Sequence, residues 1–502
     1  MTNYLFDSLF GRHATSEAPF LLLPDGEALT YRDFLTLSAR MANVFTDLGL
    51  EKGDRVAVQT GKSAQALAIY AACLRAGLVL LPLNTAYTPS ELGYFIGDAE
   101  PGLVICDPGK EDAIAPLLSQ DTTLLTLDAQ GAGSLMDRAQ AASADQAPLP
   151  CGPEDLAAIL YTSGTTGRSK GAMLSHDNLL SNAQALADLW RFSDSDVLLH
   201  ALPIFHTHGL FVAVNVVALT GGAMLFHPAF EINAIIADLP RATALMGVPT
   251  FYTRLLGDDR FTGDLVAHMR LFVSGSAPLL AETHTEFESR TGHRILERYG
   301  MTETNMNVSN PYDGARRAGT VGFPLPGVDL RITDPETGKV LPDGDIGMIE
   351  VRGPNVFKGY WRMPEKTAEE LRENGFFITG DLGQIDELGY LSIVGRQKDL
   401  IISGGYNIYP KEIEVLLDTL PGVGESAVVG VPDADFGEAV IAAVVPATGA
   451  TPDPEALLEA LRPQLARFKH PRAIRILDEL PRNTMGKVQK NLLREAFTGK
   501  TA

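Results

Sequence analysis

The sequence predicts an α/β protein with a large N-terminal body and a small C-terminal α+β domain. Across most of the 502 residues, apolar positions at helical spacing alternate with short apolar runs, which is typical of α/β folds. The pattern changes near residues 395–399, after which short strands predominate. A chain of this length can hold two to four domains, and its 45% hydrophobic and 21% charged residues are those of a globular protein.

The first part of the body is predicted to alternate helices and strands. Residues 55–59 read as a buried strand, 64–76 as a helix and 78–83 as a second strand. Residues 129–155 lack a period and are expected to form an exposed connection. Residues 210–226 predict a buried helix, a turn and a strand. An earlier helix has its apolar face at Phe34, Leu35, Leu37, Met41, Val44, Phe45 and Leu48.

The C-terminal domain is predicted to contain three strands and two helices. Strands are expected at residues 426–431, 439–445 and 473–477, and the first helix at Pro410, because proline suits the first helical position. We therefore expect one domain at 1–397 and a second at 398–502.

The net charge of -21 argues against a protein that binds nucleic acid or anionic membranes. Residues 461–502 nevertheless contain ten basic and three acidic side chains. A basic segment behind an acidic body indicates contact with an anionic ligand, although a solvated basic face explains it equally well. The three cysteines show no CxxC spacing, and no segment is predicted to span a membrane, so we expect a cytoplasmic protein.

The strongest local motif is YTSGTTGRSKGAML at residues 161–174, which follows an apolar strand at 156–160. Its glycines expose backbone N–H groups, and its hydroxyls and one ammonium can bind a polyphosphate. Because Ser169 precedes the lysine, the motif is not a Walker A loop. The candidate phosphate ligands are Thr162, Ser163, Gly164, Thr165, Thr166, Gly167 and Lys170.

Residues 161–171 resemble the phosphate loop of the adenylate-forming superfamily, which includes acyl-CoA synthetases, peptide-synthetase adenylation domains and luciferases. The resemblance spans essentially the whole chain and implies an enzyme that uses ATP, Mg²⁺ and coenzyme A. Seven further motifs follow in the superfamily's order: PIFHTHG (203–209), GSAP (275–278), YGMTET (299–304), TGD (379–381), GRQKD (395–399), SGGYN (403–407) and PRNTMGK (481–487).

Several of these motifs contain residues suited to binding a nucleotide. Glu303 offers the carboxylate oxygen that Mg²⁺ prefers, and Asp381 can accept both ribose hydroxyls. The resemblance implies that Arg396 reaches the ribose or phosphates and that Tyr299 stacks on adenine. It adds ATP contacts at Ser276, Glu297, Arg298, Gly300, Met301 and Thr302.

The resemblance also implies a mobile C-terminal domain. Lys487 would bridge the attacking carboxylate and the α-phosphate in the first half-reaction, stabilising the charge that develops. Rotation at the hinge residue Lys398 would then replace it with residues 403–409 and open a tunnel for the pantetheine thiol. Exposure during this rotation makes Lys487 a candidate target of a protein lysine acyltransferase. The implied CoA-binding residues are Ser403, Gly404, Gly405 and Tyr406.

Two arginines in the acyl-pocket motifs indicate an acid with a second carboxylate. Arg254 ends a helix that forms one wall of the acyl pocket in relatives, and Arg298 precedes the YGMTET motif. A guanidinium can bind a carboxylate through two hydrogen bonds, each worth roughly 1.5–3 kcal/mol. Thr207 and Met306 would limit the space around C2 of the acid. Two alternatives stay open: a surface ion pair for Arg254, and a contact with Glu297 for Arg298.

His206 is expected beside the acyl carbonyl, where it would help shape the CoA tunnel. A metal site is less favoured, because His208 is poorly placed to share a metal with it. Residues 246–254, 297–306 and 311–316 resemble the malonyl-CoA synthetase subfamily more closely than fatty-acyl, coumarate or acetate ligases.

The expected reaction joins malonate to coenzyme A through malonyl-AMP, releasing pyrophosphate and then AMP. One methyl group is worth only about 1–3 kcal/mol in a pocket, so methylmalonate is not distinguished from malonate. The alternatives are a ligase for medium-chain or aryl monocarboxylic acids, an adenylation enzyme that loads a carrier protein, and a non-enzymatic nucleotide-binding regulator. The presence of Glu303 and Lys487 disfavours the last.

Overall fold

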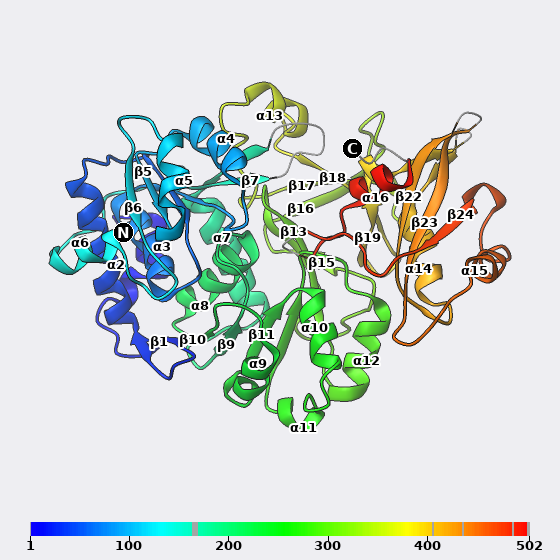
Figure 1. Cartoon of the computed structure of the whole chain (residues 1–502), viewed down its shortest axis with the longest axis horizontal. Helices are drawn as coiled ribbons and strands as arrows, with labels where there is room; N and C mark the ends of the chain where they lie inside the picture. Colours follow the sequence, from blue (N-terminus) through cyan, green and yellow to red (C-terminus); the bar gives the residue numbers. More distant parts are fainter. Residues whose placement is uncertain (1, 163–168, 404–405, 434–435, 484–485, 499–502) are drawn as a thin grey trace. The chain divides into compact units, whose positions relative to one another are not determined.

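The computed structural model describes residues 2–162, 169–403, 406–433, 436–483 and 486–498 (Figure 1). Backbone contacts divide the chain into two compact units. Unit 1 comprises Met1–Asp329 and Val351–Phe377, and unit 2 comprises Leu330–Glu350 and Ile378–Ala502. Contacts therefore group residues 378–397 with the C-terminal residues, whereas the domain boundary at Lys398 stays a prediction. In the described parts of the chain, no helix is both long and apolar enough to cross a membrane.

The N-terminal part of unit 1 is built on a six-stranded sheet that is parallel except at one edge. Two of its helices begin where a side chain caps them: Thr30 and Asp33 form a reciprocal capping box, and Ser63 accepts from the Ala66 N–H. The strand order is β6 (Thr123–Thr126), β5 (Leu103–Cys106), β3 (Arg55–Gln59), β4 (Val79–Pro82), β7 (Leu156–Thr162) and the antiparallel β8 (Lys170–Ser175). The associated helices are α2 (Tyr31–Asp47), α3 (Ala64–Ala76), α4 (Pro89–Ala99), α5 (Glu111–Ile114) and α6 (Ser134–Ala141).

The rest of unit 1 is built on a nine-stranded sheet whose central strands β1, β10, β9, β11, β12 and β13 run parallel. In sheet order the strands are β15 (Phe323–Pro324), β14 (Asn305–Ser309), β13 (Leu296–Met301), β12 (Leu271–Ser274), β11 (Ala244–Gly247), β9 (Val197–His200), β10 (Ala223–Phe226), β1 (Pro19–Leu22) and β2 (Ala28–Thr30). The helices are α1 (Tyr4–Leu9), α7 (His176–Leu189), the π-helix η4 (His208–Val214), α8 (Asn215–Thr220), α9 (Ile232–Asp238), α10 (Pro249–Leu256), α11 (Gly263–Val266), α12 (Ala281–Thr291) and α13 (Pro364–Glu370).

One buried carboxylate joins the amino ends of three of these strands. Asp196 precedes β9 and forms two hydrogen bonds with Arg270, which precedes β12, at 2.6 and 2.8 Å. It also accepts from the Thr243 hydroxyl, just before β11, at 2.8 Å. Burial alone would raise the pKa of Asp196, but these hydrogen bonds hold it below its ordinary value. The contact stabilises the amino ends of the strands. Ligands of open α/β sheets bind at the opposite edge, outside the carboxyl ends of the strands.

Unit 2 contains an antiparallel sheet covered by helices (Figure 1). Its apolar core includes Ile401, Ile413, Val428 and Val444. The strands are β21 (Tyr406–Ile408), β20 (Ile401–Ser403), β23 (Gly437–Pro446) and β22 (Val423–Asp433), with β24 (Ala473–Ile476) parallel to β23. The helices are α14 (Pro410–Asp418), α15 (Pro454–Leu461) and α16 (Lys490–Phe497). A four-stranded sheet that starts in unit 1 has the order β16 (Asp329–Thr333), β17 (Gly347–Arg352), β18 (Phe377–Ile385) and β19 (Leu391–Arg396).

The α/β architecture and most predicted elements are confirmed. Strand β3 and helix α3 have the predicted bounds, and η4, α8 and β10 form the predicted helix, turn and strand. Two expectations are wrong. Residues 129–155 contain helix α6, which buries Leu135 and Ala139, and the described residues after Lys398 form three α-helices and five strands where two helices and three strands were expected. The short α6 was missed because a helix of two turns shows too little periodicity.

We predict that Asp196→Ala destabilises unit 1 by roughly 3 kcal/mol, because it leaves Arg270 partly buried without its carboxylate. Urea unfolding followed by circular dichroism measures the loss. Asp329→Ala is the matched control. It removes an exposed ion pair with Arg352, so we expect a change below about 0.5 kcal/mol. Equal effects of the two substitutions would contradict the role of Asp196.

Candidate active site

Lys170, the basic residue of the phosphate-loop motif, lies at the start of β8 in an acidic surrounding. Its Nζ donates to both carboxylate oxygens of Glu370 at 3.0 and 3.1 Å and to the Tyr360 hydroxyl at 3.1 Å. The predicted ligand Thr162 pairs with Lys170 across β7 and β8. The other predicted ligands, Ser163, Gly164, Thr165, Thr166 and Gly167, lie outside the described residues.

Tyr360 joins Lys170 to Glu303. Its buried hydroxyl lies 2.5 Å from Glu370 Oε2 and 3.1 Å from Glu303 Oε1. A phenol has one proton, so it can donate to only one of these carboxylates at a time. Burial and the two carboxylates raise the pKa of Tyr360, which keeps it protonated. Sequence reasoning missed Tyr360 and Glu370, because neither stands in a motif with a recognisable polar pattern.

Arg298, in the middle of β13, is a buried cation that has no anionic partner among the described residues. The residue is 3% exposed, and its Nε and Nη2 form no hydrogen bond within the described chain. A Cβ at position 275 would lie 2.4 Å from the guanidinium carbon, so glycine there leaves room for the arginine. Burial lowers the pKa of Arg298 to about 9.

Further polar groups around Arg298 are also without partners. Within the described chain, buried Thr207 Oγ1, His208 Nε2 and Ser274 Oγ form no hydrogen bond. His208 lies close enough for the Arg298 charge to lower its pKa further, after burial. Its Nδ1 is 3.2 Å from the hydroxyl of Ser276, which has a left-handed backbone with φ 71°. This arrangement of donors around a buried cation fits an anionic ligand.

The proposed alternative for Arg298, a contact with Glu297, is not what the structure shows. Glu297 Oε1 accepts from the backbone N–H of Leu279 at 3.3 Å. The two residues are neighbours on strand β13, where successive side chains point to opposite faces.

Arg254 does not share the burial of Arg298. It is exposed on α10, and its guanidinium carbon lies 6.0 Å from the centre of the Phe230 ring. Arg298 is therefore enclosed and Arg254 is exposed, and the role of both arginines in binding the acid stays a prediction. The motif that contains Arg254 forms an eight-residue helix with both polar and apolar side chains. The sequence of so short a helix does not show which side chains face the interior.

The PIFHTHG motif forms a tight loop before η4. A Cβ on Gly209 would lie 2.0 Å from the Pro203 carbonyl oxygen, so only glycine fits. His206 Nδ1 accepts from the His208 N–H at 3.3 Å, and Thr207 is 2% exposed. π-Helical turns such as η4 often occur at functional sites.

Beyond Arg298, β13 passes through Tyr299, Gly300 and Met301 into a turn at Thr302. Met306, 2% exposed on β14, packs close to Gly300: a Cβ there would lie 2.6 Å from the Met306 methyl.

In unit 2, two predicted ribose ligands contact each other. Asp381 on β18 faces Arg396 on β19, with 2.5 Å between Oδ1 and Nε, and Asp381 is 4% exposed. Lys487 lies near this pair in the same unit. Burial by the surrounding chain and the Arg396 charge lower its pKa to about 8. Lys398 is exposed beside them.

Two of the residues predicted to bind CoA, Ser403 and Tyr406, pair with each other across β20 and β21. Tyr406 is 57% exposed and stacks on Phe468, with ring centres 4.5 Å apart. Ser403 ends β20, whereas Gly404 and Gly405 lie outside the described residues.

Residues 11–361 match the family model of AMP-binding enzymes, and residues 412–487 match the AMP-binding enzyme C-terminal domain. The ATP-bound structure of MatB from Rhodopseudomonas palustris is 60% identical, with 99% of both chains covered and a TM-score of 0.97.

Two curated relatives differ in the acid that their names give. A feruloyl-CoA synthase from an Amycolatopsis species is 38% identical, covering 94% of both chains. A malonate–CoA ligase from Arabidopsis thaliana is 32% identical, covering 98% of this chain and 88% of its own. With the family model matched over most of its length, the chain belongs to the AMP-binding enzymes.

Proposed function

We propose that this protein ligates malonate to coenzyme A, consuming ATP and releasing pyrophosphate and AMP. Arg298 carries the proposal, because a buried guanidinium without a counter-ion matches an acid with a second carboxylate. Similarity over nearly the full length to ATP-bound MatB and to the Arabidopsis malonate–CoA ligase supports the assignment.

A second carboxylate explains the pocket better than a monocarboxylic acid does. Ferulate or a fatty acid would leave Arg298 buried and unpaired, at a cost of several kcal/mol. Malonate would satisfy the guanidinium with one carboxylate and present the other for reaction. Thr207 and Met306 would limit the space around C2, and His206 would lie beside the reacting carbonyl.

The reaction has two steps. An oxygen of the free malonate carboxylate attacks the α-phosphorus of ATP, and the bond to pyrophosphate breaks. The thiolate of coenzyme A then attacks the acyl carbon, forming the thioester and releasing AMP. Lys487, in its charged form, would stabilise the negative charge that develops on the carboxylate and α-phosphate in the first step.

Phosphate binding is assigned to Lys170 and the hydroxyls of its loop. Glu303 is buried and can supply one carboxylate oxygen to Mg²⁺. In the described residues no group of three acidic, histidine or cysteine side chains could hold a metal. One carboxylate fits an ion that takes its other ligands from phosphates and water. When bound, Mg²⁺ would neutralise phosphate charge.

Asp381 and Arg396 would bind the ribose, with Tyr299 against the adenine and Ser276, Glu297, Gly300, Met301 and Thr302 contributing further contacts. Residues 398–502 would rotate at Lys398 and bring Ser403, Gly404, Gly405 and Tyr406 to coenzyme A. Rotation of residues 398–502 would expose Lys487 to a protein lysine acyltransferase, which would remove its charge.

We predict that Arg298→Met lowers kcat/KM for malonate by about 100-fold or more, because a charge-assisted pair is lost. A competition assay with malonate, succinate, acetate, hexanoate and ferulate, read by mass spectrometry of the thioesters, measures selectivity. Arg254→Ala is the comparison: its guanidinium is exposed, so we expect less than about a tenfold loss. Feruloyl-CoA as the main wild-type product would overturn the proposal and favour an aryl-acid ligase.

We predict that Glu370→Gln lowers KM for ATP by roughly 3-fold, because the carboxylate competes with phosphate for Lys170. Initial rates at varied ATP measure the effect. Glu369→Gln is the matched control, since Glu369 pairs with Lys366 on the surface. A higher KM for ATP in Glu370→Gln would mean that Glu370 positions Lys170 for binding.

We predict that kcat/KM of malonate-dependent ATP–pyrophosphate exchange falls as pH rises through about 8. The first step needs charged Lys487, and a lysine with a lowered pKa is charged below that value and neutral above it. Lys487→Arg should react more slowly but lose this fall, because arginine stays charged. A profile that is flat in the wild type, or unchanged in the variant, would contradict the role of Lys487.

A further inference from the structure

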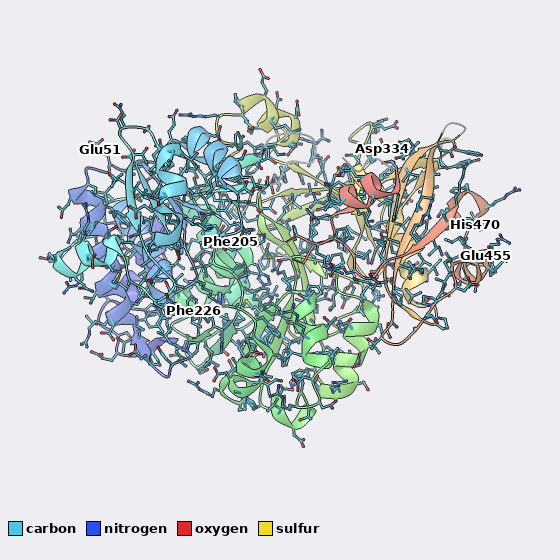
Figure 2. All side chains as sticks on the ribbon, in the orientation of Figure 1. Glu51, Phe205, Phe226, Asp334, Glu455 and His470 are labelled. Atoms are coloured by element: carbon cyan, nitrogen blue, oxygen red, sulfur yellow. The ribbon has the colours of Figure 1, made fainter. Side chains whose placement is uncertain are left out.

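Lys62 is a partly buried lysine of unit 1 that none of the nucleotide or acid motifs contains. It lies between β3 and the N-cap of α3, beside a cavity of about 330 Å³ lined also by Tyr70, Thr85 and Phe205. Figure 2 labels Phe205 and Phe226 in this central part of unit 1.

The ammonium of Lys62 is held by one histidine and one aromatic ring. Its Nζ lies 2.7 Å from His200 Nδ1 and 2.8 Å from the His200 carbonyl oxygen. It also lies 4.3 Å from the centre of the Phe226 ring. Within the described chain it has no ion pair with a carboxylate. Burial lowers the pKa of Lys62 well below its ordinary value.

The hydrogen bonds of His200 determine its tautomer. Its Nε2 lies 2.8 Å from the carbonyl oxygen of Gly209, which can only accept, so Nε2 must donate. A neutral imidazole then leaves Nδ1 as the acceptor for Lys62. The ring is 1% exposed, and its pKa is lowered by burial and by the Lys62 charge, which keeps it neutral.

This chain of contacts ends at the loop that lines the acid pocket. Gly209 closes the loop against the Pro203 carbonyl, where no side chain fits. The loop contains Thr207, and His208 follows beside Arg298. A shift of the Gly209 carbonyl would therefore move two of the polar groups around the buried guanidinium.

We propose that Lys62 and His200 are positioning residues for the acid pocket: Lys62 donates to His200 Nδ1, and His200 Nε2 in turn holds the Gly209 carbonyl. The inference deepens the proposed function and rests on it for the identity of the acid. The pair links the end of the six-stranded sheet to the loop after β9 of the nine-stranded sheet.

The test is chemical rescue of Lys62→Ala by propylamine, which replaces the three carbons and the ammonium that the substitution removes. We expect kcat/KM for malonate to fall by about tenfold or more, as for one lost hydrogen bond from a charged group, while KM for ATP stays within about twofold. Propylamine should restore kcat/KM in a saturable manner, because the adjacent cavity admits it. If Lys62→Ala has the same unfolding temperature as the wild type and propylamine still does not restore kcat/KM, the proposal is overturned.

His200 supplies the second arm. In His200→Gln the amide nitrogen can still donate to Gly209, but Nδ1 is gone. The double variant Lys62→Ala/His200→Gln should therefore resemble His200→Gln alone and show no rescue. Rescue of equal size in the double variant would show that the amine acts elsewhere. If Lys62→Ala unfolds, Lys62→Met keeps the apolar stem, and its kcat/KM for malonate should show the same loss.

Lys52→Ala is the matched control, since Lys52 is an exposed lysine of unit 1 whose ammonium pairs with Asp155 at 2.7 Å. We expect wild-type rates and no response to propylamine. The two proposals fail separately. Wild-type malonate selectivity in Arg298→Met would overturn the proposed acid, whereas the rescue can be measured with whichever acid the wild type prefers.

Discussion

The acid pocket depends on the parallel alignment of β9, β11, β12 and β13. Because these strands run in one direction, the loops that follow them meet at one edge of the nine-stranded sheet. Asp196 joins the opposite ends of three of the strands through Arg270 and Thr243. These contacts stabilise the amino edge of the sheet. The carboxyl edge is left free to carry groups whose partner is a ligand.

Arg298 shows that a binding group at the carboxyl edge of the sheet can lower the stability of the folded chain. A buried guanidinium without a carboxylate destabilises the folded chain, and a structural role would have supplied an acid nearby. The missing carboxylate also makes the pocket selective between acids. An acid with a second carboxylate pairs with the guanidinium and offsets the cost of burying it, whereas a monoacid cannot. Thr207, His208 and Ser274 also have buried polar atoms that form no hydrogen bond within the described residues, and the Arg298 charge acts on His208.

Sequence motifs predicted the elements and many of the residues, but not the contacts between distant segments. The strand at 55–59 and the helix at 64–76 have clear apolar patterns, and Arg298 lies in a motif, so each could be inferred locally. Tyr360 and Glu370 meet Lys170 across 190 and 200 positions of the chain, and Lys62 meets His200 across 138, so no local pattern reveals them. The exposure of Arg254 could not be inferred, because a short helix motif does not show which way one side chain points.

Three cations of unit 1, Lys170, Lys62 and Arg298, differ in the groups that surround their charge. This difference determines how each can bind a ligand. Lys170 has a protein carboxylate, Glu370, so a phosphate must displace an existing partner, and binding there is an exchange. Lys62 has a neutral imidazole and an aromatic face, which hold its position without cancelling its charge. Arg298 Nε and Nη2 form no hydrogen bond within the described residues, so an acid that binds there displaces no protein carboxylate in that part of the chain. We therefore expect the protein to discriminate most strongly between acids, because an acid without a second carboxylate leaves the buried Arg298 charge uncompensated.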